Sequence, residues 1–254
     1  MRTILVTGGT GGIGKALVEL FALQGDRVYF TYHSNKSKAD DLEQALSDYR
    51  VHGLYFNQGN YDAVAELLSQ IPTKIDVLIN NAALGSATVE KVAESKAEQD
   101  ELLFKVNVLG PLWLTEAVVE SMRSNDSGKI ISISSVGGGI NQFPGFRLAD
   151  SMSKSAIALM TKQLAAELVY TPIDVFAVCP GATATAMFDA STLQSLTDVE
   201  KQQLITALPK SRLIQPNELA ELCLFLASEK SQVMHGAVID ASMGLGVNPS
   251  CLKK

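Results

Sequence analysis

The sequence contains few of the residues that build disulfide frameworks or metal sites. Among its 254 residues are three cysteines and three histidines, namely Cys179, Cys223, Cys251, His33, His52 and His235. The cysteines are odd in number and far apart, which argues against a disulfide framework or a zinc site and favours a reducing compartment. The histidines lack the spacing of metal ligands, so we interpret them as structural or surface residues and expect no metal site.

The sequence also lacks an excess of basic residues and any obvious membrane segment. It has 21 Lys and Arg against 27 Asp and Glu, a net charge of −6, which gives no attraction for nucleic acid or a membrane surface. No apolar run approaches the roughly 20 residues of a membrane helix. The first residues, Met1 to Thr3, lead directly into a strand pattern instead of a secretory signal. We therefore expect a cytoplasmic protein.

Strand-like and helix-like segments alternate along the whole chain. Strand patterns are found at about 3–6, 28–32, 54–56, 75–79, 129–134, 173–178 and 237–239, and helical patterns at about 15–22, 37–48, 63–68, 96–122, 151–169 and 217–227. No linker, repeat or charge block divides them. Apolar strands that alternate with helices predict an α/β fold: one domain over residues 1–254, with a Rossmann-like, doubly wound parallel sheet covered by helices on both faces.

A glycine-rich stretch, Thr7 to Gly14, lies between the first strand and the first helix. Gly8, Gly12 and Gly14 allow a sharp turn and a close approach of the backbone to a ligand. The helix that follows offers free N–H groups and the positive end of its dipole. A glycine-rich turn alone indicates only a tight loop, but this strand, turn and helix form the context that a dinucleotide-binding site requires.

The glycine spacing, T-G-x-x-x-G-x-G, resembles that of the short-chain dehydrogenase/reductase family. Asn80-Asn81-Ala82-Ala83 resembles the family's N-N-A-G run, with Ala83 in place of glycine, and residues 180–187 resemble its P-G-x-x-x-T-x-M loop. The motifs occur in the family's order over about residues 3–246. The chain is similar to classical members of the 3-oxoacyl-ACP-reductase type, and the resemblance implies NAD(P) binding and carbonyl/alcohol chemistry.

The resemblance also implies a set of site residues. The implied cofactor-binding residues are Gly8, Thr10, Gly12, Ile13, Gly14, His33, Ser34, Asn35, Asn57, Gln58, Asn81, Ala82, Ala83, Lys154, Pro180, Gly181, Thr183 and Thr185. The implied catalytic residues are Asn107, Ser135, Asp150 and Lys154. Within this set Ser135 binds the substrate oxygen, Lys154 holds the nicotinamide ribose, and Asn107 distorts its helix and holds a water in a proton relay.

The end of the second strand favours NADP(H) over NAD(H). An acidic side chain there would bind the ribose hydroxyl and repel a 2′-phosphate. This chain has instead a polar stretch, Thr31 to Lys36, whose hydroxyls, amide and cation suit a 2′-phosphate. Against this, Gly11 stands where NADP-using relatives often carry a basic residue. The alternative interpretation of the stretch is an ordinary polar turn.

The chain departs from the family at the centre of its chemistry. The family motif Y-x-x-x-K here reads Asp150 to Lys154, and no tyrosine occurs between Tyr61 and Tyr170. Aspartate is ordinarily ionised at neutral pH, so Asp150 can accept a proton but is a poor donor. The alternatives are that Asp150 acts as a base through water, or that it only forms an ion pair with Lys154 and takes no part in the chemistry.

The leading functional hypothesis is therefore an NADP(H)-dependent oxidoreductase for a small carbonyl or secondary alcohol, with an atypical acid/base group and slow turnover. One alternative is a non-catalytic dinucleotide-binding protein with a sensor or assembly role. Another is a lyase or isomerase that uses Asp150 as a base. The helical stretches at about 100–122 and 151–169 resemble those the family packs across two-fold axes, which implies a homodimer or homotetramer.

Overall fold

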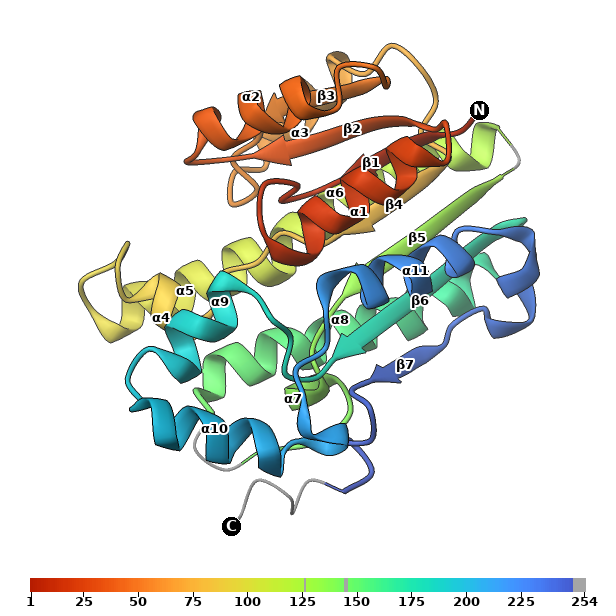
Figure 1. The fold of residues 1–254 in the computed structure, drawn as a ribbon. Coiled ribbons are helices and arrows are strands. Elements are labelled where there is room, and N and C mark those ends of the chain that lie inside the picture. Colours follow the sequence, from red (N-terminus) through yellow and green to blue (C-terminus); the bar gives the residue numbers. More distant parts are fainter. Residues whose placement is uncertain (126, 144–145, 249–254) are drawn as a thin grey trace.

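Seven short apolar segments pair side by side into one parallel sheet (Figure 1). The computed structural model describes residues 1–125, 127–143 and 146–248. The strands are β1 (Thr3–Val6), β2 (Arg27–Tyr32), β3 (Val51–Tyr55), β4 (Val77–Asn80), β5 (Gly128–Ile133), β6 (Ile173–Pro180) and β7 (Val238–Ala241). Their order across the sheet is β3-β2-β1-β4-β5-β6-β7, and every neighbouring pair is parallel.

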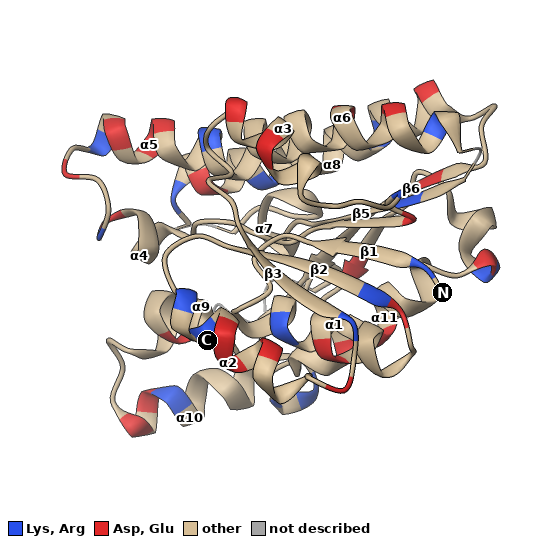
Figure 2. Cartoon of the chain, turned by 90° about the horizontal axis from the view of Figure 1, so that it is seen from above, with Lys and Arg blue, Asp and Glu red and all other residues tan. Residues whose placement is uncertain are grey.

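Helices cover both faces of this sheet. The longer ones are α1 (Gly12–Leu23), α2 (Lys36–Ala45), α3 (Asp62–Ser69), α5 (Lys96–Phe104), α6 (Gly110–Ser124), α8 (Leu148–Leu168), α10 (Asp198–Ala207) and α11 (Pro216–Leu226). The shorter ones are α4 (Ser86–Val89), α7 (Val136–Gly139), α9 (Ala186–Phe188), the π-helices η1 (Lys105–Leu109) and η2 (Asp189–Leu193), and the 3-10 helices η3 (Pro209–Ser211) and η4 (Glu229–Met234). Figure 2 shows α1, α2 and α11 below the sheet and α3, α6 and α8 above it.

The central strands are buried on both sides because alternate side chains enter two separate cores. On β5, Ile131 packs with α1 and α11, while Ile130 packs with α3, α6 and α8. On β6, Phe176 packs in the same core as Ile131, and Val175 packs in the same core as Ile130. Continuous apolar strands of this kind are typical of parallel sheets with helices on both faces. The single α/β domain expected from the sequence is confirmed.

The predicted helical region at 96–122 is three elements in the structure, since η1 interrupts it between α5 and α6. The whole run, Lys96–Ser124, is long and apolar enough by length and composition to cross a membrane, which the sequence reading did not expect. In this fold, however, α6 packs on β4, β5 and α3. Part of the apolar face of the run is therefore buried in the core of the domain.

Candidate active site

The sheet reverses its strand order between β1 and β4, since the chain runs outward through β2 and β3 before returning to β4. Ligands of doubly wound folds bind at such a switch point, beyond the carboxyl ends of the strands. There the fold brings together the glycine turn after β1, the Asn81–Ala83 segment after β4, Ser135 after β5 and the 180–185 loop after β6. These four segments carry most of the predicted site residues.

The glycine turn leaves no room for side chains at Gly8, Gly12 and Gly14. Gly8 and Gly12 have positive φ angles of 69° and 31°. A Cβ atom on Gly14 would lie 2.1 Å from the carbonyl oxygen of Gly8. Helix α1 begins after Gly11 without a side-chain cap, so its first N–H groups remain available to an anion. The turn therefore fits the diphosphate of a dinucleotide.

Asn81 holds the turn in place. Its Nδ2 donates to the carbonyl oxygens of Thr7 and Gly8, at 2.9 and 3.1 Å. In return, the Thr7 hydroxyl accepts the backbone N–H groups of Asn81 and Ala82, each at 3.0 Å. Sequence reasoning missed Thr7, although a threonine that ends a buried strand immediately before a glycine turn is a usable signal.

The 180–185 loop closes the cradle from the opposite side. A Cβ atom on Gly12 would lie 2.6 Å from Cγ2 of Thr185, so these two segments are in direct contact. The Thr185 hydroxyl accepts from the N–H of Phe188 and caps α9. Thr183 is buried, and its hydroxyl donates to the Gly181 carbonyl. Thr185 thus borders the turn, whereas Thr183 supports the loop from within.

Two predicted cofactor residues after β3 have other partners in this structure. Asn57 accepts from the N–H of Gly59 and forms a local turn. Gln58 is buried, and its Nε2 donates to the carbonyl oxygens of Ala82 and Val106, at 3.0 and 2.8 Å. Its Oε1 has no partner among the described residues. Gln58 therefore joins the ends of β3 and β4 to η1.

A cavity of about 310 Å³ lies between Thr10 of the glycine turn, helix α1 and helix α2, which follows the polar stretch after β2. The other lining residues are Lys15, Lys38, Asp41, Leu42 and Ala45. His33 stacks on Tyr55, with ring centroids 5.8 Å apart, and Asn35 caps α2 by accepting from the N–H of Lys38. Sequence reasoning missed both lysines, although one follows the glycine turn directly and the other lies in the first turn of the next helix.

Asn107 lies within η1, the helix distortion that the resemblance implies. Its Oδ1 accepts from the N–H of Leu84 at 2.8 Å, and its Nδ2 donates to the Leu84 carbonyl at 2.9 Å. The same Nδ2 donates to the hydroxyl of Ser153 on α8 at 3.1 Å. A buried carboxamide with this many bonds fixes η1 against both the loop after β4 and α8.

The segment of Ser135, after β5, is bonded to the α8 turn that carries Lys154. The Ser135 hydroxyl accepts from the N–H of Gly137, and Ser134 donates to the carbonyl oxygen of Lys154 at 2.8 Å. Lys154 is half-buried. Burial lowers the pKa of its ammonium, and the negative charge of Asp150 opposes that shift.

Asp150 lies in the first turn of α8, where the helix dipole favours a negative charge. Its Oδ2 accepts two hydrogen bonds from Ser86, one from the backbone N–H at 3.1 Å and one from the hydroxyl at 2.8 Å. Among the described residues, the ion pairs do not include one between Asp150 and Lys154. The described part of the chain therefore lacks the direct ion pair that one alternative assigned to Asp150, although the charge of Asp150 still acts on Lys154, and whether Asp150 takes part in the chemistry stays a prediction.

All the tyrosines lie away from Lys154. Five of the six belong to β2, β3 or the segments next to them. The sixth, Tyr170, follows the far end of α8, sixteen residues beyond Lys154, which corresponds to roughly 24 Å along a helix. None of the six tyrosines therefore lies within α8, the helix that carries Lys154.

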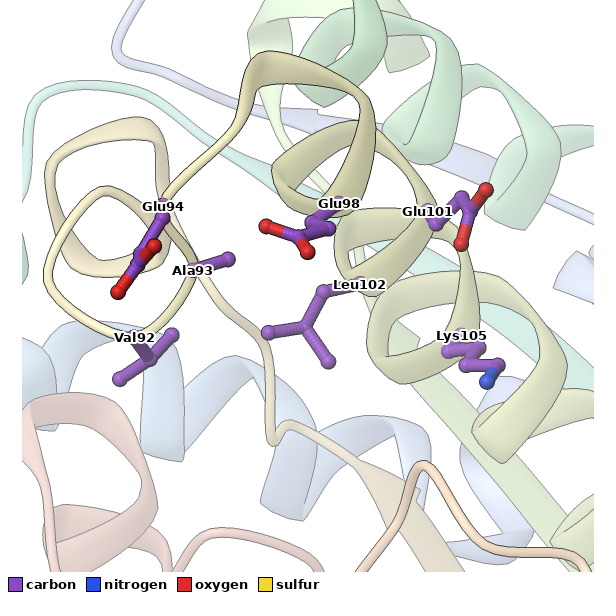
Figure 3. A pocket seen from close by; sticks show the side chains of 7 residues that line it. All are labelled: Val92, Ala93, Glu94, Glu98, Glu101, Leu102 and Lys105. Carbon is purple, nitrogen blue, oxygen red and sulfur yellow. The ribbon is translucent and has the colours of Figure 1, made fainter.

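A second cavity, of about 400 Å³, lies beside α5 and outside the cradle (Figure 3). It is lined by Val92, Ala93, Glu94, Glu98, Glu101, Leu102 and Lys105. The Glu98 carboxylate is engaged, since it accepts from the N–H of Ser95.

In residues 1–125, 127–143 and 146–248, no group of three His, Cys, Asp or Glu side chains is placed to hold a metal ion.

The cysteines of the described residues are free and buried. Burial raises the pKa of Cys179 to about 11 and that of Cys223 to about 12, so neither is a thiolate at neutral pH. Cys251 lies outside the described residues.

A doubly wound parallel sheet with a glycine turn between its first strand and first helix is typical of dinucleotide-binding proteins. Residues 2–195 match the short chain dehydrogenase family, and the chain belongs to that family. It is therefore an oxidoreductase of a family that binds NAD(P) and acts on alcohol or carbonyl substrates.

Relatives with known activities cover nearly the full length of the chain. The 3-oxoacyl-[acyl-carrier-protein] reductase of Thermotoga maritima is 32% identical over 249 residues, which are 96% of this chain and 97% of the relative. An actinorhodin polyketide ketoreductase solved with NADPH superposes with a TM-score of 0.84 at 26% identity, over 96% of this chain and 97% of its own. A 3-oxoacyl-[acyl-carrier protein] reductase of Brucella melitensis with bound NAD superposes with a TM-score of 0.83 at 26% identity, over 96% of this chain and 90% of its own.

Proposed function

We propose that the protein is an NADP(H)-dependent oxidoreductase that interconverts a small carbonyl compound and its secondary alcohol. The observation that carries the proposal is that the segments of Ser135, Lys154 and Asn107 are bonded to one another at the carboxyl edge of the sheet, where the glycine turn also lies. Ser134 donates to the Lys154 carbonyl, and Asn107 donates to Ser153, the residue before Lys154. When bound, the nicotinamide cofactor supplies or accepts the hydride. The side chains of this chain then have to orient the substrate oxygen and move a proton.

The three residues divide these tasks. The Ser135 hydroxyl, at the end of β5, orients the substrate oxygen. The Lys154 ammonium holds the nicotinamide ribose and provides a proton through water near Asn107. Asp150 stands where the family has its tyrosine and contributes a carboxylate in place of a phenol. General acid–base catalysis contributes about 10² to 10⁴-fold, so the loss of the phenol predicts slow turnover.

A screen of ketones with NADPH and of alcohols with NADP⁺ tests this proposal, with the natural protein and Asp150→Tyr compared at each substrate. We expect slow turnover of at least one carbonyl class and a gain of at least tenfold in Asp150→Tyr. If the natural protein turns over a substrate and Asp150→Tyr abolishes that activity, Asp150 is itself a catalytic residue. No association with either NADPH or NADH would overturn the proposal.

The preference for NADP(H) is supported by the cavity beside Thr10. No acidic residue ends β2, and Lys15 and Lys38 line the cavity together with one acid, Asp41. We expect Lys38→Ala to weaken NADPH binding about tenfold and NADH binding little, because only NADPH carries the phosphate. Lys74→Ala is the matched control, since Lys74 is paired with Asp76 and lies outside the lining of the cavity. Fluorescence titration measures both affinities, and equal losses for the two nucleotides would contradict the preference.

The assembly we propose is a homodimer or homotetramer in the cytoplasm. Helix α8 exposes Leu148, Met152 and Leu159, which are 73%, 49% and 67% accessible. Their spacing of four and seven residues places them on one face of the helix. A contiguous exposed apolar stripe of this kind is a feature of protein–protein contacts.

One observation favours the non-catalytic alternative. Oδ2 of Asp150 accepts two hydrogen bonds from Ser86, so one of the two carboxylate oxygens already has a structural role. A sensor or assembly protein would bind NADPH tightly and turn over no ketone, alcohol or proton-exchange substrate. The same screen therefore separates this role, and that of a lyase or isomerase, from the oxidoreductase.

A further inference from the structure

We propose that Ser86 and Asp150 form a latch that joins the loop after β4 to the first turn of α8 and positions one wall of the substrate cleft. In this role Ser86 is a positioning residue. The functional consequence rests on the oxidoreductase proposed above, but the latch itself is a property of the free protein.

The latch consists of two hydrogen bonds from one residue to one carboxylate oxygen. The backbone N–H and the hydroxyl of Ser86 both reach Oδ2 of Asp150, at 3.1 and 2.8 Å. Both residues are half-buried, so water competes only in part for these bonds. Hydrogen bonds to a charged acceptor are stronger than those between neutral groups. An ionised Asp150 therefore holds the loop more firmly than a neutral side chain would.

The latch closes a ring of contacts among three elements. Two residues before Ser86, both backbone groups of Leu84 bind the carboxamide of Asn107 on η1. Asn107 also donates to Ser153, whose hydroxyl donates to the backbone carbonyl of Asp150 at 2.7 Å. The loop is thus held at two points, and each of them leads back to the same turn of α8.

The latched loop also supports the segment on the other side of the cleft. Gly85, between the two anchor points, is buried, and a Cβ atom there would lie 3.2 Å from the sulfur of Met187 on α9. The neighbouring helix α4 packs against η2, which continues from α9. The latch therefore fixes the distance between α8, which carries Lys154, and α9, which follows Thr185.

This arrangement gives Asp150 a role besides acid–base catalysis. Because its carboxylate is turned to Ser86, the Lys154 ammonium has no ion-pair partner among the described residues and stays available to the cofactor and substrate. The position that departs from the family motif thus stabilises the cleft wall. We therefore expect loss of the latch to weaken substrate binding more than it slows the chemical step.

Amide hydrogen exchange on the protein without nucleotide or substrate tests the latch. We expect Ser86→Ala and Asp150→Ala to speed exchange at residues 84–89 by at least tenfold. Ser86→Thr, which keeps the hydroxyl, and Asp150→Asn, which keeps an acceptor oxygen, should retain most of the protection. Ser151→Ala, on the same turn of α8, is the control, because its hydroxyl makes no hydrogen bond within the described residues.

Unchanged exchange in both Ser86→Ala and Asp150→Ala would overturn the latch, as would faster exchange in Asp150→Ala alone. With an active substrate in hand, Ser86→Ala should raise KM several-fold and leave the dissociation constant of NADPH within about twofold. The exchange result stands whether or not the redox screen finds a substrate. A failure of the latch and a failure of the proposed function are therefore distinguishable.

Discussion

At the scale of single residues, neighbouring glycines of the turn differ sharply in their surroundings. A Cβ atom on Gly14 would lie 2.1 Å from the Gly8 carbonyl oxygen and 2.6 Å from Nδ2 of Asn81, whereas one on Gly11 meets nothing within 4 Å. Backbone atoms cannot yield as the end of a flexible side chain does. The room for a diphosphate therefore depends on Gly14 far more than on Gly11.

We predict that Gly14→Ala weakens nucleotide binding by at least tenfold, because the added methyl group pushes the turn away from Asn81. Gly11→Ala is the control and should change the affinity by less than about threefold. Isothermal titration with NADPH measures both values. Similar losses in the two variants would show that flexibility of the turn, and not close packing at Gly14, governs binding.

Lys154 makes the stability of the protein depend on pH. Burial lowers the pKa of its ammonium below the ordinary value of 10.5. Between the lowered value and 10.5 the unfolded chain binds more protons than the folded one, so the free energy of unfolding rises with pH across that window. At pH values below the lowered pKa both states keep the proton, and the buried charge of Lys154 then destabilises the folded state by its full desolvation cost.

We therefore predict that Lys154→Met is more stable than the natural protein at neutral pH and that its advantage shrinks as the pH approaches 10.5. Urea denaturation at several pH values between 7 and 10 measures the difference. Lys162→Met, on the exposed side of the same helix, should show no such trend. An advantage for Lys154→Met that is independent of pH would point to packing of the methionine instead.

At the scale of elements, the π-helix η1 shows how one extra residue in a turn serves a site. The wider turn carries Asn107 inward, where the side chain is 2% exposed, and its carboxamide satisfies both backbone groups of Leu84. Regular α-helix on both sides continues the run. The distortion joins the cofactor-side loop to α8 without a break in the helical layer.

Replacement of Asn107 by alanine should lower the free energy of unfolding by about 1–3 kcal/mol, because buried N–H and carbonyl groups of Leu84 lose their partners. Asn125→Ala removes an exposed bond to the Ser121 carbonyl at the end of α6 and serves as the control. Its cost should be below about 0.5 kcal/mol. Urea denaturation measures both, and equal costs would contradict a special role for η1.

Some elements were predictable from the sequence and others were not. The strands and the helices α1, α3 and α11 follow from apolar runs and helical spacing, and their bounds differ from the prediction by only a few residues. Helix α10 was missed, since it has no buried residue and hence no apolar period to detect. Its start does carry a capping box at Thr197 and Glu200, a local signal that sequence reasoning overlooked.

At the scale of the whole molecule, the two helical layers bury separate apolar cores and leave charges of both signs on their outer faces (Figure 2). Against that background the apolar stripe of Leu148, Met152 and Leu159 on α8 stands out. Burial against a second copy of the chain would remove it from water.

We predict that Leu159→Glu shifts the assembly toward the monomer, because a carboxylate at the centre of an apolar contact would lose its hydration. Val233→Glu is the control, since Val233 is 93% exposed on η4 and lies outside the stripe. Light scattering coupled to size exclusion measures the mass of each variant. An unchanged mass for Leu159→Glu, with the natural protein oligomeric, would place the interface elsewhere.

The sequence by itself determined the parallel sheet, the glycine cradle and the membership of the short chain dehydrogenase family. Each of these depends on short local motifs: apolar strands, a glycine turn followed at once by a helix, and for the family several such motifs in order along the chain. Such patterns can be recognised before any tertiary contact is known, because local conformation and burial dictate them.

Only the tertiary structure decided what surrounds Lys154 and Asp150. The two residues lie one helical turn apart, and that spacing predicts an ion pair. The carboxylate instead binds Ser86, which is 64 positions away in the chain and reaches α8 only because the loop after β4 folds against η1. A contact between segments so distant is set by the packing of the whole sheet and its helices, which no local pattern records.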